Sequence, residues 1–252
     1  MISDNYILRP SWTAPESVQA LGTTRKGGVS QAPWASLNLG THVGDEAGSV
    51  AENRQRLARF TGLDVGQIGW LNQVHGTRVV ELTPETVKGV PEADASFTRV
   101  PGLACAILTA DCLPVVLADA RGTVVGAAHA GWRSLAGGVL EKLVTAMGVE
   151  PGTLSAWLGP AIGPDSFEVG PEVRDCFVQH SPQAARAFKT DGARPGHFMA
   201  DLYRLATQRL ERAGVNSVAG GSICTVQDKE WFFSYRRDGQ TGRMVTLIWI
   251  KA

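Results

Sequence analysis

The chain has 252 residues, of which 44% are hydrophobic and 19% charged, and its 24 basic residues balance 24 acidic ones. This length and apolar content can bury a full core, so we expect one α/β domain over residues 1–252. A net charge of zero offers no basic field to nucleic acid or to an anionic membrane, which excludes both as expected partners. The first ten residues lack a secretory pattern, and no run approaches the ~18 apolar residues of a membrane span, which predicts a cytoplasmic protein.

A cation-rich turn follows the first expected strand. Residues 11–30 contain a short strand that ends in Thr-Thr-Arg-Lys-Gly-Gly, and the glycine pair after Arg25 and Lys26 permits a tight turn. Backbone N–H groups and two cations come together there, so the turn could bind an anion. An ordinary solvated turn has the same pattern, and the spacing leaves both interpretations open.

A loop, a helix and two strands are expected next. Residues 37–45 are loop-like and contain His42, and a single loop histidine is more often a hydrogen-bonded structural residue than a ligand. Apolar residues at helical spacing predict a helix over residues 47–60. We expect two strands with a hairpin turn near His75, over residues 68–76 and 77–82.

The central segment, residues 103–135, is the part around which we expect the fold to be organised. Short apolar runs bounded by Asp, Gly and Pro predict buried strands at residues 103–108, 114–118 and 124–128. Cys112 lies between the first two runs, and His129 follows the third. Both side chains are therefore expected at strand ends, where a rigid sheet can present them to a cleft.

Helices and strands keep alternating to the C-terminus, without an internal repeat. Apolar spacing predicts helices over residues 134–147 and 198–213 and a third helix that begins at Pro171. We expect strands at residues 154–158, 217–226 and 244–250, and a polar segment at 232–238. The spacings do not all fit a βαβ winding, so we predict an α/β (α+β) fold with mixed sheets and helices packed outside.

Four cysteines are too few and too scattered for a disulfide scaffold in a chain of this length. Cys105, Cys176 and Cys224 lie in patterns that predict small buried hydrophobic side chains. Cys112, between Asp111 and a Leu-Pro pair, is the cysteine whose position points to chemistry.

His75, Cys112 and His129 are the histidines and the cysteine placed at strand-to-turn junctions in the first half of the chain. Two imidazole nitrogens and one thiolate suit Zn²⁺, and three protein ligands leave a fourth tetrahedral position open, as in catalytic zinc sites. Such a metal lowers the pKa of its bound water toward ~7. The sequence separations of 37 and 17 residues match no finger-type signature.

Two other interpretations use the same residues. Cys112 could be a nucleophile with His129 as its base, as in cysteine hydrolases without a metal. Alternatively, Cys112 packs in the core and the two histidines form hydrogen bonds with the backbone. Residue types and spacing leave these interpretations and the zinc site open.

Seven ordered motifs between residues 23 and 250 add a resemblance. They are TTRKGGVS, NLGTHVGD, NQVHG, TADCLPVVLAD, AAHAGWRSLAGG, GPAIGPDSFEVG and FFSYRRDGQTGRM. Together they resemble the YfiH family, also called laccase-domain or multicopper polyphenol oxidase proteins. The resemblance implies one α/β domain with mixed sheets and Zn²⁺ bound by His75, Cys112 and His129.

The resemblance also implies an activity, purine nucleoside phosphorylase on adenosine, inosine and related nucleosides, with adenosine deaminase and methylthioadenosine phosphorylase activity at the same site. Zinc fits deamination, since activated water can attack C6 of adenine. For the phosphate partner, Arg25, Arg133 and Arg236 are candidates, because a guanidinium fork matches phosphate oxygens. Asp111, beside Cys112, could orient a ligand, handle a proton or cap its turn.

The copper in the family's older name can be tested on histidine content. Laccase chemistry takes roughly ten histidines, many in His-x-His pairs. The chain has five histidines and no such pair, so we exclude four-copper oxidation, although copper could occupy a His-Cys-His site adventitiously. A non-catalytic module in cell-wall quality control, with structural zinc, is a further alternative. It would need a fourth ligand, for which His42 is the remaining candidate, and His42 could face substrate instead.

Overall fold

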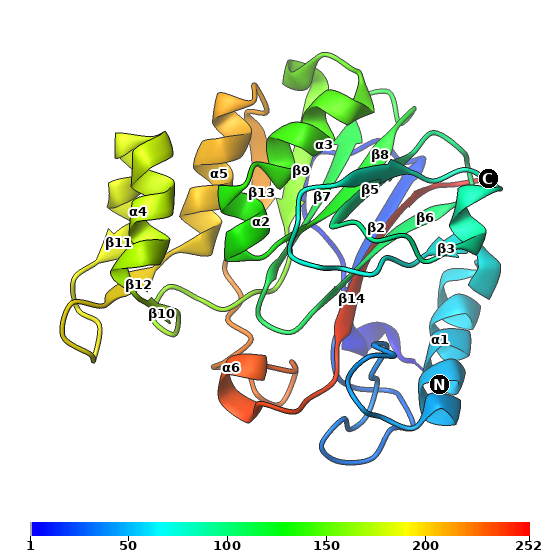
Figure 1. The fold of residues 1–252 in the computed structure, drawn as a ribbon. Coiled ribbons are helices and arrows are strands. Elements are labelled where there is room, and N and C mark those ends of the chain that lie inside the picture. Colours follow the sequence, from blue (N-terminus) through cyan, green and yellow to red (C-terminus); the bar gives the residue numbers. More distant parts are fainter. Residues whose placement is uncertain (1) are drawn as a thin grey trace.

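Two mixed β-sheets pack face to face in the computed structural model, which describes residues 2–252 (Figure 1). The five-stranded sheet has the order β1-β2-β14-β6-β3. Its strands are β1 (Ile7–Leu8), β2 (Val18–Thr23), β14 (Met244–Ile250), β6 (Ala104–Thr109) and β3 (Ile68–Gly69). Only β3 runs parallel to its neighbour, β6, while the other pairs are antiparallel.

The six-stranded sheet has the order β13-β9-β7-β8-β5-β4. Its strands are β13 (Ser217–Gly220), β9 (Leu154–Leu158), β7 (Leu113–Asp119), β8 (Val125–Ala130), β5 (Ala95–Thr98) and β4 (Val79–Glu81). A small antiparallel sheet beside it contains β10 (Glu168–Val169), β12 (Phe198–Ala200) and β11 (Phe188–Lys189).

The helices are α1 (Ala47–Thr61), α2 (Trp132–Ala136), α3 (Val139–Met147), α4 (Pro171–His180), α5 (Leu202–Arg212) and α6 (Tyr235–Asp238). Helix α1 packs on the outer face of the five-stranded sheet, α2, α3 and α5 pack on that of the six-stranded sheet, and α4 lies beside the small sheet (Figure 1). Short 3₁₀ turns occupy Asp4–Tyr6, Val65–Gln67, Thr86–Lys88, Pro151–Thr153 and Pro182–Ala187. Among the helices described, none is both long enough and apolar enough to cross a membrane.

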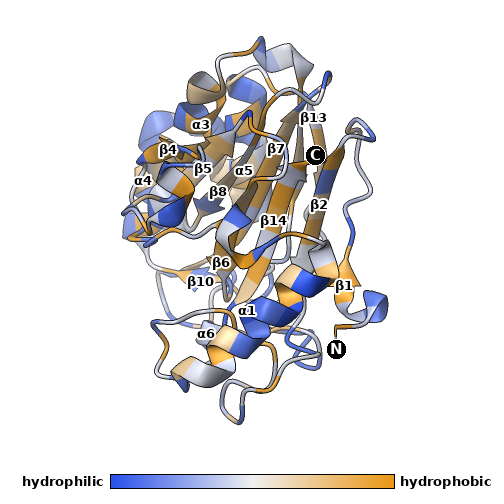
Figure 2. Cartoon of the chain, turned by 90° about the vertical axis from the view of Figure 1, so that its right-hand side faces the viewer, coloured by the Kyte–Doolittle hydropathy of each residue, from blue (hydrophilic) through white to orange (hydrophobic). Residues whose placement is uncertain are grey.

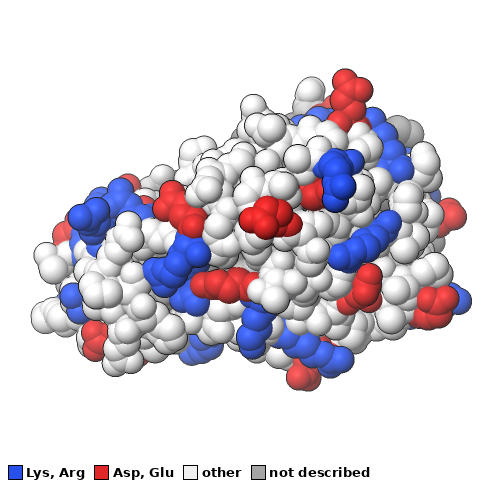
Figure 3. All heavy atoms as spheres, turned by 90° about the horizontal axis from the view of Figure 1, so that it is seen from above, with Lys and Arg blue, Asp and Glu red and all other residues white. Residues whose placement is uncertain are grey.

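The central strands are buried on both faces, which explains their continuous apolar runs. In β7, Val115 and Leu117 pack under the helices, whereas Val116 faces the five-stranded sheet. In β6, Ile107 faces the six-stranded sheet, and Ala106 packs beneath α1. Figure 2 shows the strands as mostly hydrophobic, while α1 combines hydrophobic and hydrophilic residues. On the face seen in Figure 3, acidic and basic side chains are interspersed.

This architecture confirms the expected α/β fold with mixed sheets and outer helices, but several local predictions were wrong. The expected helix at 198–213 begins at Leu202, because residues 198–200 pair with β10 and β11 and Asp201 caps the helix by accepting a hydrogen bond from Arg204 N (2.9 Å). The expected helix at 134–147 is divided into α2 and α3 at a glycine pair, where Gly138 has φ +93°.

The expected hairpin at His75 is also wrong. β3 belongs to the five-stranded sheet and β4 to the six-stranded sheet, so the connection that carries His75 crosses between the sheets. The strand expected at 217–226 ends at Gly220, and the polar segment at 232–238 contains α6.

Two of the three cysteines expected to be buried are not. Cys105 lies in the core, and burial raises the pKa of its thiol to about 12. Cys176 is exposed on α4, and Cys224 is partly exposed.

Candidate active site

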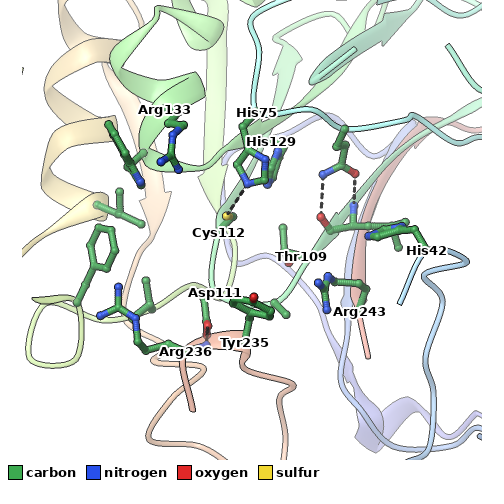
Figure 4. A pocket seen from close by; sticks show the side chains of 17 residues that line it. His42, His75, Thr109, Asp111, Cys112, His129, Arg133, Tyr235, Arg236 and Arg243 are labelled. Carbon is green, nitrogen blue, oxygen red and sulfur yellow. Dashed lines mark hydrogen bonds between the residues drawn. The ribbon is translucent and has the colours of Figure 1, made fainter. Parts of the chain in front are cut away.

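Three potential metal ligands converge at one end of the sheets (Figure 4). One ligand atom from each of His75, Cys112 and His129 lies within 4.8 Å of the other two, and Cys112 Sγ is 3.8 Å from His75 Nε2. The two imidazole rings meet edge to face, with their centroids 4.8 Å apart. The structure thus brings together the residues that the sequence placed at strand-to-turn junctions.

Strand connections between the two sheets account for this convergence. The turn with Cys112 leads from β6 to β7, and the loop with His75 leads from β3 to β4, so both cross from one sheet to the other. His129 lies near the end of β8, opposite Pro114 of β7. The ladder between β7 and β8 therefore fixes the imidazole beside the cysteine turn.

Asp94 joins the two histidines. Its carboxylate is fully buried, and Oδ1 accepts hydrogen bonds from His75 N (3.0 Å) and from His129 Nδ1 (2.8 Å). Oδ2 accepts from Val74 N (3.2 Å) and Gly76 N (2.6 Å), so the carboxylate is wrapped by the loop in which His75 has a left-handed φ of 61°. An ionised carboxylate only accepts, so Nδ1 of His129 carries the proton and Nε2 is left for a ligand.

The electrostatics favour a thiolate. Burial by itself raises the pKa of the Cys112 thiol, but His129 and His75 outweigh it and bring the pKa to about 6. Burial likewise disfavours a charged His129, yet Cys112 and Asp94 raise its pKa to about 9. Burial also acts against ionised Asp94, and its hydrogen bonds with His129 and Gly76 still hold its pKa below the ordinary range. Without a metal, the site therefore holds a thiolate beside an imidazolium.

The donor set fits a zinc ion. Bonds of about 2.0–2.3 Å in tetrahedral geometry place neighbouring donors roughly 3.4–3.8 Å apart, and the three atoms here need only small movements to reach that spacing. A lowered thiol pKa and an oriented imidazole are what zinc ligation requires. Within the described residues, His42 lies outside this group of donor atoms, so the group of potential ligands has three members.

A cavity of about 540 Å³ opens beside the cluster. Figure 4 shows Arg133 and Arg236 on one side of His75, Cys112 and His129, and His42 and Arg243 on the other side. On the first side, Trp132 and Phe167 make the cavity lining partly aromatic. The guanidinium of Arg133 lies 4.3 Å from the centroid of the Trp132 ring, and that of Arg236 lies 5.4 Å from the centroid of the Phe167 ring.

The other residues predicted from the sequence are distributed as follows. Arg133, Arg236, His42 and Asp111 line the cavity. Arg25 does not: its Nε donates to Ala35 O (3.0 Å), its Nη1 donates to Lys229 O (3.1 Å), and its guanidinium packs over Phe233. The turn at Arg25 is therefore tied to neighbouring backbone, and we do not include it in the site.

Asp111 has a positioning geometry. Its side chain is buried, with Oδ1 accepting from Thr225 Oγ1 (2.6 Å) and Oδ2 accepting from Arg236 N (2.6 Å). The residue has a left-handed φ of 89° in the turn just before Cys112. Its carboxylate thus ties the cysteine turn to the segment that begins α6.

Sequence reasoning missed several functional candidates, above all Asp94, Gln73 and Arg243. Gln73 exchanges two 2.8 Å hydrogen bonds with the backbone of Leu108 and so holds the His75 loop against β6 (Figure 4). Arg243 lines the cavity immediately before β14. Its position next to a strand, inside the motif FFSYRRDGQTGRM, was the available signal.

Similar proteins cover nearly the whole chain. A protein of Pseudomonas aeruginosa named purine nucleoside phosphorylase is 53% identical over 247 residues, which is 98% of this chain and 99% of that protein. Purine nucleoside phosphorylase YfiH of Escherichia coli is 48% identical over 244 residues, with 97% and 98% covered. The crystal structure of a Neisseria meningitidis protein of the family-model DUF152 superposes with a TM-score of 0.93 at 51% identity and covers 98% of this chain and 100% of that one.

The crystal structure of YlmD from Geobacillus stearothermophilus gives a TM-score of 0.89 at 31% identity and covers 98% of this chain and 99% of that chain. The family model described as multi-copper polyphenol oxidoreductase laccase matches residues 19–251. The sequence matches and the fold matches both cover nearly the whole chain. The chain therefore belongs to the YfiH family, the family that carries this laccase description.

Proposed function

We propose that this chain is a zinc-dependent purine nucleoside phosphorylase. The observation that carries the proposal is the three-donor cluster of His75, Cys112 and His129 facing a cavity of about 540 Å³. This volume lies within the range of small-molecule sites. Relatives with about half of their residues identical bear the name of this activity, which gives the cavity its expected substrate class.

The lining suits a nucleoside. Trp132 and Phe167 offer aromatic surface to a purine ring, and Arg133, Arg236 and His42 offer donors to the sugar, the base or phosphate. Asp111 holds the backbone of Arg236 in place through a 2.6 Å hydrogen bond. We propose Arg133, Arg236 and His42 as substrate contacts and Asp111 as a positioning residue.

We extend the proposal to adenosine deamination and to phosphorolysis of methylthioadenosine in the same cavity. Bound zinc would supply Lewis acidity and a lowered pKa of water, which deamination of adenine needs. Through the 2.8 Å hydrogen bond to Nδ1, Asp94 orients the imidazole of His129 so that Nε2 would be the nitrogen that binds the ion. Copper would bind the same ligand set adventitiously, since it exceeds zinc in affinity for nitrogen and sulfur donors.

The test is product analysis on protein of measured zinc content. Adenosine is incubated with and without phosphate, and adenine, inosine and hypoxanthine are separated by chromatography. We expect phosphate-dependent release of adenine or hypoxanthine, its loss in Cys112→Ala, and its retention in the matched control Cys176→Ala on the exposed face of α4. No product from fully zinc-loaded protein would refute the proposal.

A metal-free cysteine hydrolase is the second candidate, and a specific geometry favours it. In this hydrolase, Cys112, with a thiol pKa of about 6, would be the nucleophile. His129 would be its base, and Asp94 would orient the imidazole through the 2.8 Å hydrogen bond. His75 separates the two candidates. A triad does not need His75 as a ligand, so His75→Ala would retain hydrolysis with a higher pKa at Cys112, whereas the zinc enzyme would lose metal and activity.

A structural zinc in a non-catalytic module makes another prediction. A closed site needs a fourth protein ligand, and His42 would have to supply it. Because His42 lies outside the donor group, we expect His42→Ala to retain one zinc per chain and to weaken turnover. Loss of zinc from this variant would instead favour the structural role.

A further inference from the structure

We propose that the end of the cavity formed by Arg243 and His42 is a binding subsite for a tetrahedral oxyanion, occupied by inorganic phosphate. The role of phosphate as a reactant rests on the proposed function, whereas the anion site itself does not. Phosphate would then bind on the side of His75, Cys112 and His129 that lies opposite Arg133 and Arg236 (Figure 4).

The sheet register brings Arg243 next to the metal cluster. Met244 pairs with Thr109 at the end of the ladder between β14 and β6. Arg243, one residue earlier, therefore lies beside Ala110, two residues from Cys112. An anion held by this arginine would be adjacent to the cysteine turn.

The backbone of Arg243 is locked to the loop that carries His42. Its N–H donates to Asn38 Oδ1 (2.9 Å), and its carbonyl accepts from Leu39 N (3.2 Å). A Cβ at Gly40 would lie 2.8 Å from Arg243 Cγ, so the glycine permits the loop to pack on the arginine stem. The loop that leads to His42 is thus packed against the backbone and the side-chain stem of Arg243.

The guanidinium of Arg243 is only partly satisfied by the protein. Nη1 donates to Thr241 O and Gly242 O, both at 3.0 Å. In the described part of the chain, no Asp or Glu forms an ion pair with it, and Nε and Nη2 make no hydrogen bond to the protein. Burial lowers its pKa below the ordinary 12.5, although Cys112, Asp111 and Tyr235 act in the opposite direction. The remaining Nε and Nη2 edge matches two oxygens of a phosphate.

A second arginine adds positive charge at this end of the cavity, and the two arginines favour the neutral form of His42. The pKa of His42 is lowered by burial and then by the positive charges of Arg243 and Arg54. Arg54 is already used, because its Nε and Nη2 both donate to Leu39 O and its guanidinium stacks on Trp70. Asp45 accepts hydrogen bonds from Ser30 and Asn38, and among the described residues it forms no ion pair with Arg243 or Arg54.

The arginines at the opposite end have a different environment. Arg133 and Arg236 are exposed to solvent, whereas Arg243 is only partly exposed. All three lie over aromatic rings, Arg243 over Tyr235 at 5.9 Å, and Arg236 Nη1 donates to Glu168 O (3.1 Å). Solvent already stabilises the charge of Arg133 and Arg236, and the rings beside them suit a purine. We therefore place the nucleoside base toward Arg133 and Arg236, and phosphate at Arg243.

Direct binding of inorganic phosphate tests the subsite without turnover. Calorimetric titration of the zinc-loaded protein with phosphate, in the absence of nucleoside, should give an affinity about 10- to 100-fold weaker in Arg243→Met. Arg243→Lys keeps the positive charge but loses the two-pronged guanidinium, so its phosphate affinity should lie between those of wild type and Arg243→Met. Arg133→Met, at the other end of the same cavity, should weaken phosphate binding less than Arg243→Met does. The matched control Arg59→Met, outside this cavity, should bind phosphate within about twofold of wild type.

Folding and zinc content are checked by thermal unfolding and metal analysis on every variant. If Arg243→Met does not fold, Arg243→Lys and His42→Gln carry the test, each with a weaker phosphate affinity expected. Three results would overturn the subsite: unchanged affinity in the folded Arg243 variants, a larger loss in Arg133→Met, or no binding to wild type at millimolar phosphate.

The test separates the subsite from the proposed function. Phosphate binding that depends on Arg243, in a protein that cleaves no nucleoside, would leave the anion site standing and refute the phosphorylase. Phosphorolysis with a KM for phosphate that is unchanged in folded Arg243→Lys would refute the subsite and leave the phosphorylase. With both correct, the KM for phosphate rises in Arg243→Lys while the KM for the nucleoside changes little.

Discussion

At the scale of single residues, Asp94 is the side chain that holds two of the three potential metal ligands, His75 and His129, in position. One buried carboxylate accepts four hydrogen bonds, three from the backbone of the His75 loop and one from the imidazole of His129. The backbone bonds stabilise a left-handed conformation at His75, which a side chain with Cβ rarely adopts. The imidazole bond selects the tautomer that leaves Nε2 available.

Asp94→Asn should weaken zinc binding about 10- to 100-fold, because the amide NH₂ must face either the imidazole N–H or a backbone N–H. Either contact turns His129 or the His75 loop away from its ligand position. Zinc affinity measured by competition with a chelator checks this. Asp119→Asn is the matched control, since Asp119 is also buried but lies at the far end of β7. Equal zinc affinity in wild type and Asp94→Asn would contradict the role.

At the scale of elements, the hairpin of β7 and β8 carries Cys112 at its start and His129 near its end. Asp119 closes the turn between the strands: Oδ1 accepts from Thr123 N (2.6 Å) and Val124 N (2.9 Å), and Oδ2 accepts from Thr123 Oγ1 (2.8 Å). Burial acts to raise the pKa of this carboxyl, and the hydrogen bonds outweigh it, so the pKa lies below the ordinary 3.8. The turn thereby joins β7 and β8 at the end of their ladder, where Ala118 pairs with Val125.

The stability from Asp119 should depend on pH in a defined direction. A folded-state pKa below the unfolded one means that the ionised carboxylate stabilises the fold above pH ~4 and that this stability is lost as the pH falls through the folded-state pKa. Asp119→Asn should lower the free energy of unfolding by about 1–3 kcal/mol at pH 7. Urea unfolding of both proteins at several pH values checks this. A difference that stays constant down to pH 3 would contradict it.

The elements also show where pattern reading succeeds and fails. The runs at β6, β7 and β8 were predictable because both faces of these strands are buried, and a continuous apolar run records that directly. The strand at residues 198–200 was not predictable, because the apolar spacing of the following helix continues through it. Pairing with β10 and β11 holds these residues extended. Tertiary pairing overrides local propensity there.

Over the whole molecule, the site lies where the chain crosses between the two sheets. The His75 loop and the Cys112 turn both make this crossing, and Arg243 enters β14 beside them. A metal ion at His75, Cys112 and His129 would therefore bind two sheet connections and one strand together. Its binding should stabilise the folded state as a whole.

Zinc at 100 times its dissociation constant should add about 2.7 kcal/mol and raise the Tm by roughly 5–10 °C. Calorimetric melting of zinc-loaded and chelator-treated protein measures the shift. Cys112→Ala should melt at the same temperature with and without zinc. A wild-type Tm that does not respond to zinc would count against a metal site that links the sheets.

The sequence by itself determined the fold class, the buried central strands and the three residues most suited to a metal, because apolar runs and residue chemistry are local properties. Tertiary structure decided the rest. The hydrogen bonds of Asp94 reach across 18 to 35 residues of chain, and Arg243 lies beside Ala110 through sheet register, so neither role leaves a local pattern. Arg25 carried the expected residue type for an anion site, but the fold directs its guanidinium to backbone carbonyls away from the cavity. The chemical groups of the site can be read from single residues in the sequence. Which of these groups lie close together depends on which strands pair and on where the chain crosses between the sheets.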